Sequence, residues 1–133
     1  MIILSLLMNT IVATTHASEL KECVVKAVIK VESSGIPTKI NNICYGLMQL
    51  QLATARDMGF TGKLEELLIG SINKKYGTAY IKWLLKRYNN QLFTALDAYN
   101  RGILNVEKKP YVGKWEEHPY VGLILKNMEP NCI

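Results

Sequence analysis

Apolar side chains recur at helical spacing in several stretches of the chain. Residues 20–32, 72–87 and 91–99 each place apolar residues three and four positions apart, which predicts amphipathic helices. Residues 47–58 turn helical again after a glycine, residues 64–69 predict a short helix or turn, and residues 119–127 predict a last helix. No strand-like alternation of any length, internal repeat or low-complexity tract is visible. The pattern predicts a mainly α fold.

Turn-forming residues separate these helical stretches. Residues 35–42 have turn chemistry throughout, so we expect a loop from residue 33 to about residue 45 that forms the floor of a cleft. Gly59 is expected to end the second helix. Asn90 is expected to cap the helix of residues 91–99, and Gly102 to stop it.

Length and charge limit the classes of protein that fit. At 133 residues, the chain has room for one domain with a single core. Its 16 Lys and Arg against 11 Asp and Glu give a net charge of +5, which suits an anionic partner such as cell wall, nucleic acid or a membrane surface. The lysines are spread around the predicted helices and are not gathered with aromatic residues, so nucleic acid is not the partner we expect.

The N-terminal segment predicts export. Residues 1–17 carry no Asp, Glu, Lys or Arg and contain a short apolar run that ends in small residues, with Thr15 and Ala17 placed for cleavage before Ser18. We therefore interpret residues 1–17 as a signal peptide and residues 18–133 as the mature domain, located in the periplasm or cell envelope. An uncleaved anchor is the alternative, because no Lys or Arg precedes the run.

Three cysteines are an odd number for an exported protein. The simplest hypothesis is one disulfide with one thiol left over. A bond between Cys23 and Cys132 would join the first mature helix to the C-terminus, and Cys44 lies two residues before a glycine turn, but the sequence leaves the pairing open. A metal site is not expected, since His118 stands alone in the mature domain.

Glu32 is the candidate for chemistry. It lies one turn beyond Val28, on or beside the buried stripe of its helix, where poor solvation would raise the pKa of a carboxyl group and suit a general acid. The alternative is a helix-end glutamate whose head reaches solvent. Phosphate-loop, dinucleotide, zincin and catalytic-triad motifs are missing, and no cofactor is expected. Glycoside hydrolysis usually needs two carboxyl groups, and Asp57 and Asp97 are the next candidates.

Four short motifs follow one another along the chain. They are ESSG at residues 32–35, YGLMQL at 45–50 with ATA at 53–55, Asn73 with Gly77 and Tyr80, and AYNRG at 98–102, followed by PYV at 119–121. Each motif is weak alone, but their order and spacing resemble the lytic transglycosylase domain related to goose-type lysozyme. The resemblance implies a lysozyme-like single domain of helices around a substrate cleft.

The resemblance also implies a reaction. The family cleaves the β-1,4 bond between N-acetylmuramic acid and N-acetylglucosamine in the glycan strands of peptidoglycan. Glu32 would first protonate the leaving oxygen and then take the proton from the muramic 6-hydroxyl, which closes a 1,6-anhydro ring without water. A goose-type lysozyme-like hydrolase, or a non-catalytic peptidoglycan-binding component of an envelope-spanning secretion system, are the alternatives.

A set of substrate-binding residues follows from the same motifs. Gln49 matches the family's cleft glutamine, and Tyr99 matches a tyrosine whose hydroxyl approaches the catalytic acid. Asn42 is expected to replace a loop serine that holds the sugar's acetamido group, and Arg101 to meet a peptide-stem carboxylate. Gln49 and Tyr99 also have plain structural interpretations, as an exposed helix residue and a core aromatic. The expected substrate-binding set is Gln49, Tyr99, Asn100, Met48, Tyr45, Tyr80 and Asn42.

The small size of the domain and its predicted export bear on the biological setting. A small exported domain resembles the specialised wall-opening enzymes of secretion systems, so components of a secretion, conjugation or pilus apparatus are expected as partners. Phage lysis and general wall remodelling are the alternatives.

Overall fold

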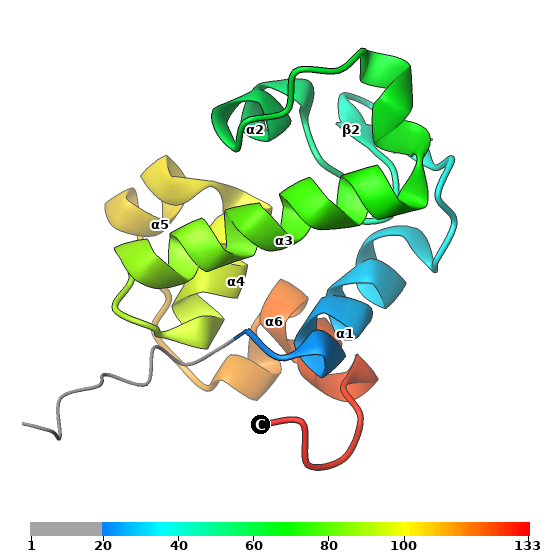
Figure 1. The fold of residues 1–133 in the computed structure, drawn as a ribbon. Helices are drawn as coiled ribbons and strands as arrows, with labels where there is room; N and C mark the ends of the chain where they lie inside the picture. The colour runs from blue at the N-terminus through cyan, green and yellow to red at the C-terminus, as the bar shows by residue number, and fades with distance from the viewer. Residues whose placement is uncertain (1–19) are drawn as a thin grey trace, which may run out of the picture.

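The longest helix, α3 (Gly70–Arg87), crosses the middle of the molecule, and the other helices are arranged around it (Figure 1). The computed structural model describes residues 20–133. The remaining helices are α1 (Glu22–Ser33), α2 (Leu52–Asp57), α4 (Leu92–Arg101), α5 (Ile103–Lys108) and α6 (Pro119–Asn127). The 3-10 turns η1 (Leu64–Leu68) and η2 (Trp115–Glu117) precede α3 and α6, and two short strands, β1 (Ile40–Asn41) and β2 (Cys44–Tyr45), follow α1. The prediction of a mainly α domain is confirmed.

Two apolar clusters hold these elements together. The larger one lies between α1, α3, α4 and α6 and includes Val28, Leu84, Leu96 and Ile124, all fully buried. The smaller one, built from Leu50, Ala55, Phe60 and Leu67, lies beneath α2 and η1. In Figure 1, α2 and β2 lie on one side of α3, while α1 and α6 lie together on the other. Helix α3 lies between the two sides and contributes residues to both clusters.

Several predicted helix boundaries match the structure. The last predicted helix has the bounds of α6, and Gly102 ends α4 with a φ of 85°. The helix predicted from residue 47 is wrong at its start, because α2 begins only at Leu52. Asn90 is not a cap, since Gln91 holds the N-cap position of α4 and Asn90 adopts a φ of 61° in the preceding turn. Helix α5 and the short strands were not predicted, because six and two residues are too few to show a period.

The loop expected between residues 33 and 45 contains a small antiparallel hairpin. Ile40 pairs with Tyr45 and Asn41 with Cys44, and Asn42 adopts a φ of 56° in the turn between the strands. Tyr45 forms a further bridge with Leu50, so the chain folds back twice before α2 begins. A residue with positive φ must occupy this tight turn, and asparagine tolerates that conformation better than most.

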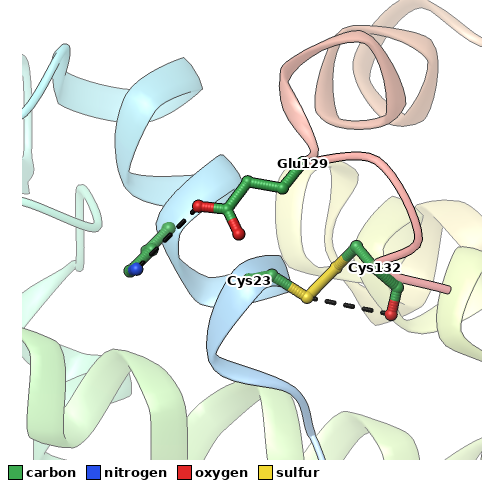
Figure 2. Close-up of a disulfide and its surroundings, with 4 residues drawn as sticks. Cys23, Glu129 and Cys132 are labelled. Atoms are coloured by element: carbon green, nitrogen blue, oxygen red, sulfur yellow. Dashed lines mark hydrogen bonds and ion pairs between the residues drawn. A yellow bond between two sulfur atoms is a disulfide. The ribbon is translucent and has the colours of Figure 1, made fainter.

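A disulfide joins the two ends of the described chain (Figure 2). It links Cys23 in the first turn of α1 to Cys132, next to the C-terminus, which leaves Cys44 as the free thiol among residues 20–133. One of the pairings left open by the sequence is thus present. The exposed Glu129 carboxylate lies 3.9 Å from the Lys26 amine on the same side, a contact that contributes little because both groups face solvent.

The Cys132→Ser variant is expected to lower the free energy of unfolding by about 3 kcal/mol. The bond closes a loop with a sequence separation of 109 residues, so its loss restores a large conformational freedom to the unfolded chain. Urea denaturation measures the change, and Cys44→Ser is the control because Cys44 is not in the bond. Reductant should bring the wild type down to the level of the variant; a wild type insensitive to full reduction would contradict the prediction.

None of the helices within residues 20–133 is long and apolar enough to cross a membrane. The predicted signal peptide, residues 1–17, lies outside the described residues.

Candidate active site

A cavity of about 500 Å³ opens where α1, the hairpin, α3 and α4 meet. Five of the residues expected at the site line it together: Glu32, Gln49, Tyr80, Tyr99 and Asn100. They come from both sides of α3 and from positions almost seventy residues apart in the sequence. The fold therefore brings the motifs to one place, although their roles toward a ligand stay predictions.

Glu32 reaches this cavity because helix α1 ends directly after it. Ser34 adopts the left-handed conformation with a φ of 55°, and its amide closes the last turn on the Lys30 carbonyl. The buried Ser33 hydroxyl donates back to the Ile29 carbonyl. The Lys39 amine donates to the Glu32 backbone carbonyl at 2.8 Å, which places a cation at the negative end of the helix. These contacts fix the backbone of Glu32 and leave its carboxyl group directed to the cavity.

The carboxyl group of Glu32 has one hydrogen-bond partner among the described residues. The Tyr120 hydroxyl, at the start of α6, donates to Glu32 Oε1 at 2.7 Å. Burial raises the pKa of Glu32 above its ordinary value of 4.5, and the Tyr120 hydrogen bond and the charge of Lys39 offset only part of that rise. A carboxyl group in such a setting keeps its proton to higher pH than an exposed one and can donate it.

Gln49 is held in an unusual backbone conformation at the cavity wall. Its φ is 52°, which is uncommon for a side chain of this size and costs on the order of 1 kcal/mol. Its amide nitrogen donates to the carbonyls of Lys39, at 3.1 Å, and Gly46, at 2.9 Å. The amide oxygen makes no hydrogen bond within residues 20–133, so it is open to a donor on a ligand.

Asn73 holds the turn that carries Gln49. Its fully buried amide accepts from the Met48 amide at 2.7 Å and donates to the carbonyls of Tyr45 and Leu67, at 2.7 and 2.9 Å. Gly46 leaves the space for this amide, since a Cβ at that position would overlap Asn73, and its φ is 79°. Asparagine and glycine are thus both required by the geometry of one turn.

Three of the expected substrate-binding residues do not line the cavity. Met48 is fully buried, and its side chain packs against the bare face of Gly77 in α3. Tyr45 is half-buried and packs against the smaller apolar cluster. Asn42 is exposed in the hairpin turn, and its neighbour Asn41 lines the cavity instead. The pattern could not separate these positions, because a tight turn alternates inward and outward side chains within a few residues.

Two tyrosines lie near the acid, and the motifs assigned a role to only one of them, Tyr99. The Tyr99 hydroxyl donates to the Met48 carbonyl at 2.5 Å, whereas Tyr120 contacts Glu32. Burial, and then the charge of Glu32, raises the pKa of Tyr99 well above 10, so Tyr99 stays a neutral hydroxyl beside the acid. The only sequence signal for Tyr120 is its place in the PYV tail motif, which names no role for it.

The family model described as the transglycosylase SLT domain matches residues 9–118, most of the chain. The chain belongs to this SLT transglycosylase family. The resemblance drawn from the four motifs is therefore confirmed at the level of the family.

Solved structures of similar fold include two lytic transglycosylases. An inactive mutant of Slt from Pseudomonas aeruginosa matches 81% of this chain with a TM-score of 0.64 and 20% sequence identity, over 18% of its own length. The 70 kDa soluble enzyme SLT70 from Escherichia coli matches 84% of this chain at the same TM-score and identity, over 17% of its own length. This SLT domain thus spans less than a fifth of either chain. The likeness confirms the lysozyme-like helical fold.

The two other candidate acids of the SLT domain lie outside the cavity, and among the described residues Glu32 is the carboxyl group that lines it. Asp57 is exposed at the end of α2. Asp97 is fully buried in α4 and is bound by Arg101, at 2.6 and 2.7 Å, and by His118 Nε2, at 2.9 Å. Arg101 also lines the cavity, and two of its guanidinium nitrogens already bind Asp97, so its expected contact with a peptide-stem carboxylate stays a prediction.

The Asp97 network reaches the tyrosine that contacts the acid. His118 Nδ1 accepts from the backbone amides of Tyr120 and Val121, at 3.2 and 3.1 Å, and so caps the first turn of α6. Because Nδ1 is an acceptor, the neutral ring carries its proton on Nε2 and donates it to Asp97. The Asp97 carboxylate, paired with Arg101, thus orients the imidazole of His118. The imidazole in turn orients the start of α6, from which Tyr120 reaches Glu32.

The Tyr120→Phe variant is expected to raise the pKa of Glu32. The phenol hydrogen bond stabilises the carboxylate and lowers its pKa. Without the hydroxyl, less remains to offset the rise in pKa that burial causes. The loss of one hydrogen bond should also lower the free energy of unfolding by about 1 kcal/mol. NMR titration of the Glu32 side-chain carbon measures the pKa. Tyr99→Phe is the matched control, since its hydroxyl binds the Met48 carbonyl; an equal shift in both variants would contradict a specific role for Tyr120.

Proposed function

We propose that this SLT domain is a peptidoglycan lytic transglycosylase that cleaves the β-1,4 bond between N-acetylmuramic acid and N-acetylglucosamine and leaves 1,6-anhydromuramic products. One observation carries the proposal: a partly buried carboxyl group with a raised pKa, Glu32, lines the cavity formed by the family motifs. Two carboxyl groups would be needed to activate water in the usual way. A single acid suffices when the sugar supplies its own nucleophile.

Glu32 acts first as a general acid. Its protonated carboxyl group donates to the glycosidic oxygen as the bond to the muramic C1 breaks, and the raised pKa keeps that proton to higher pH than an exposed glutamate would. The carboxylate formed in this step is stabilised by the Tyr120 hydroxyl already bound to Oε1. The substrate's N-acetyl oxygen stabilises the positive charge that develops at C1.

Glu32 then acts as a general base. The carboxylate takes the proton of the muramic 6-hydroxyl, and the 6-oxygen attacks C1 to close the anhydro ring. The proton lost in the first step is regained in the second, so the enzyme returns to its starting state without an added acid or base. The partly enclosed position of Glu32 favours this closed proton cycle, since it limits exchange with bulk water.

The other cavity residues position the sugar. The free amide oxygen of Gln49 accepts from a hydroxyl or acetamido N–H of the substrate, and its amide nitrogen is tied to the backbone so that the oxygen is preoriented. Asn100, exposed at the end of α4, offers a second amide at the cavity wall. Tyr80 and Tyr99 supply apolar ring surface between them, with ring centroids 5.4 Å apart.

The substrate also implies a location. Peptidoglycan lies outside the cytoplasmic membrane, so the proposed activity requires export, in agreement with the predicted signal peptide. We propose action in the periplasm or cell envelope, where a small wall-opening enzyme would serve a secretion, conjugation or pilus apparatus.

Digestion of purified sacculi tests the proposal. The wild type is expected to release muropeptides that mass spectrometry identifies as 1,6-anhydro species, which lack one water relative to reducing-end products. Reducing-end muramic products would instead indicate a water-using, goose-type hydrolase. No release from sacculi that the protein binds would favour a non-catalytic peptidoglycan-binding component instead.

A further inference from the structure

A second cavity of about 260 Å³ continues from the candidate active site. It shares two wall residues, Thr54 and Tyr80, with the cavity that holds Glu32, so the two cavities adjoin each other, and a path drawn through both runs between α2, α3 and α5. Its remaining walls come from Asp57, Met58, Trp83 and Ile103. The path leads away from the acid and ends at the exposed indole of Trp83.

Trp83 is exposed although it belongs to the apolar stripe of α3. The pattern of residues 72–87 places it with the core, yet 41% of the residue faces solvent. Its ring is stacked on Tyr80, with centroids 6.2 Å apart and an interplanar angle of 20°. The Arg87 guanidinium lies 5.9 Å from the indole centroid and is itself bound to Glu107. The indole is thus held in place while part of it stays open.

Three aromatic rings follow the path outward from the acid. Tyr99 and Tyr80 are 5.4 Å apart, and Trp83 follows at 6.2 Å. Tyr99 and Tyr80 are half-buried, and Trp83 is exposed. Of the exposed large apolar side chains among residues 20–133, Trp83 is the one that lines this second cavity, so its ring is placed to meet a ligand there.

The carboxylate-bearing residue Asp57 also lines the second cavity. Asp57 is exposed at the end of α2, and its charge is close enough to Tyr80 to contribute to the raised pKa of that phenol, after burial and the charge of Tyr88. No salt bridge or hydrogen bond within residues 20–133 engages its carboxylate. A carboxylate accepts hydrogen bonds from two neighbouring hydroxyl groups, and an aromatic face packs against the apolar C–H face of a pyranose ring.

We propose that Trp83 and Asp57 form an additional sugar subsite, in which a further N-acetylhexosamine unit of the glycan strand stacks on the indole while its hydroxyl groups bind Asp57. This subsite rests on the proposed function, since it extends the same cleft, and it makes the domain select long glycan strands over short fragments. The volume of the cavity suits one sugar ring, and its continuity with the first cavity through Tyr80 sets the direction of the strand.

The test measures how affinity depends on chain length. Isothermal titration calorimetry on the full chain, in a Glu32→Gln background that prevents turnover, compares the trimer and the hexamer of β-1,4-linked N-acetylglucosamine. The hexamer is expected to bind about tenfold more tightly than the trimer, since burying one face of an indole contributes on the order of 1.4 kcal/mol. Trp83→Ala should reduce this ratio to near one, and Trp83→Phe should restore most of it.

The controls separate a binding role from a structural one. Leu123→Ala removes an apolar side chain of similar exposure on α6, outside both cavities, and should keep the parent ratio. Thermal unfolding should be similar in all variants, because Trp83 is exposed. Three results would overturn the subsite. The Glu32→Gln parent could bind both oligomers equally tightly, it could bind neither oligomer, or the added Trp83→Ala change could leave the affinity ratio of the parent unchanged. The products from sacculi are measured separately, so reducing-end products would overturn the proposed function and leave the affinity ratio intact.

Discussion

The Glu32→Gln variant is expected to release muropeptides from sacculi about a thousandfold more slowly than the wild type, because both proton transfers lose their carrier. Gln keeps the size of the side chain and an oxygen that still accepts from the Tyr120 hydroxyl, so the cavity should keep its shape. The loss is therefore expected in turnover, with binding of glycan oligomers retained.

The same variant has an expected effect on stability with a defined sign. Burial raises the pKa of Glu32 above 4.5, so the folded state holds this proton more tightly than the unfolded chain does. The stabilising contribution is fully present below pH 4.5 and is lost as the pH rises through the folded-state pKa. Gln does not ionise, so Glu32→Gln should equal the wild type in acid and be more stable near neutral pH.

Urea denaturation at acid and neutral pH measures this difference, and digestion of sacculi measures the rate. Glu22→Gln is the matched control, since Glu22 lies on the same helix but is exposed and paired with Lys74. The control should keep the rate of the wild type. Unchanged muropeptide release by Glu32→Gln would refute the role of this acid, and a variant less stable than the wild type at neutral pH would refute the destabilising effect of burying the charged carboxylate.

Sequence patterns predicted the parts of the fold that local chemistry decides. The bounds of α6 follow from a proline at its first position, and the end of α4 follows from Gly102, which adopts a positive φ. The start of α2 did not follow, because the chain turns at Gln49 with a φ of 52° and bridges back from Leu50 to Tyr45 before the helix begins. Nothing in the identity of a glutamine signals that conformation.

The same limit applies to the site. Glu32, Gln49 and Tyr99 were found because they stand in short motifs, and the structure brings them to one cavity. Tyr120 was missed as the partner of Glu32, since the contact joins residues 88 positions apart. His118, interpreted only as a lone histidine, proved to be a helix cap whose other nitrogen binds a buried acid. Contacts of this kind depend on tertiary packing, which a single sequence does not display.

The Asp97→Asn variant is expected to lower the free energy of unfolding by about 3 kcal/mol near neutral pH, because it leaves the Arg101 charge without its buried partner. Burial alone would raise the pKa of Asp97, but the Arg101 hydrogen bond and the contacts with His118 and Arg101 lower it below 3.8. For an acid with a lowered pKa, the stabilisation is present above 3.8 and is lost as the pH falls through the folded-state value.

The pH dependence separates this network from a simple packing effect. The stability difference between wild type and Asp97→Asn should be full at neutral pH and shrink in strong acid, where Asp97 is protonated in both the folded and unfolded states of the wild type. Asp57→Asn carries the same substitution at an exposed position and should change the unfolding free energy by less than about 0.5 kcal/mol. Urea denaturation across the acid range makes the comparison, and a difference that stays constant with pH would contradict the assignment.

The same variant should also affect the acid itself. Without the Asp97 carboxylate, His118 Nε2 loses the acceptor that holds the ring with Nδ1 turned to the amides of α6. The first turn of α6 then loses its cap, and the Tyr120 hydroxyl is no longer held at Glu32 Oε1. The pKa of Glu32 should therefore rise in Asp97→Asn as it does in Tyr120→Phe, and the two changes should not add in the double variant, because both act through one hydrogen bond.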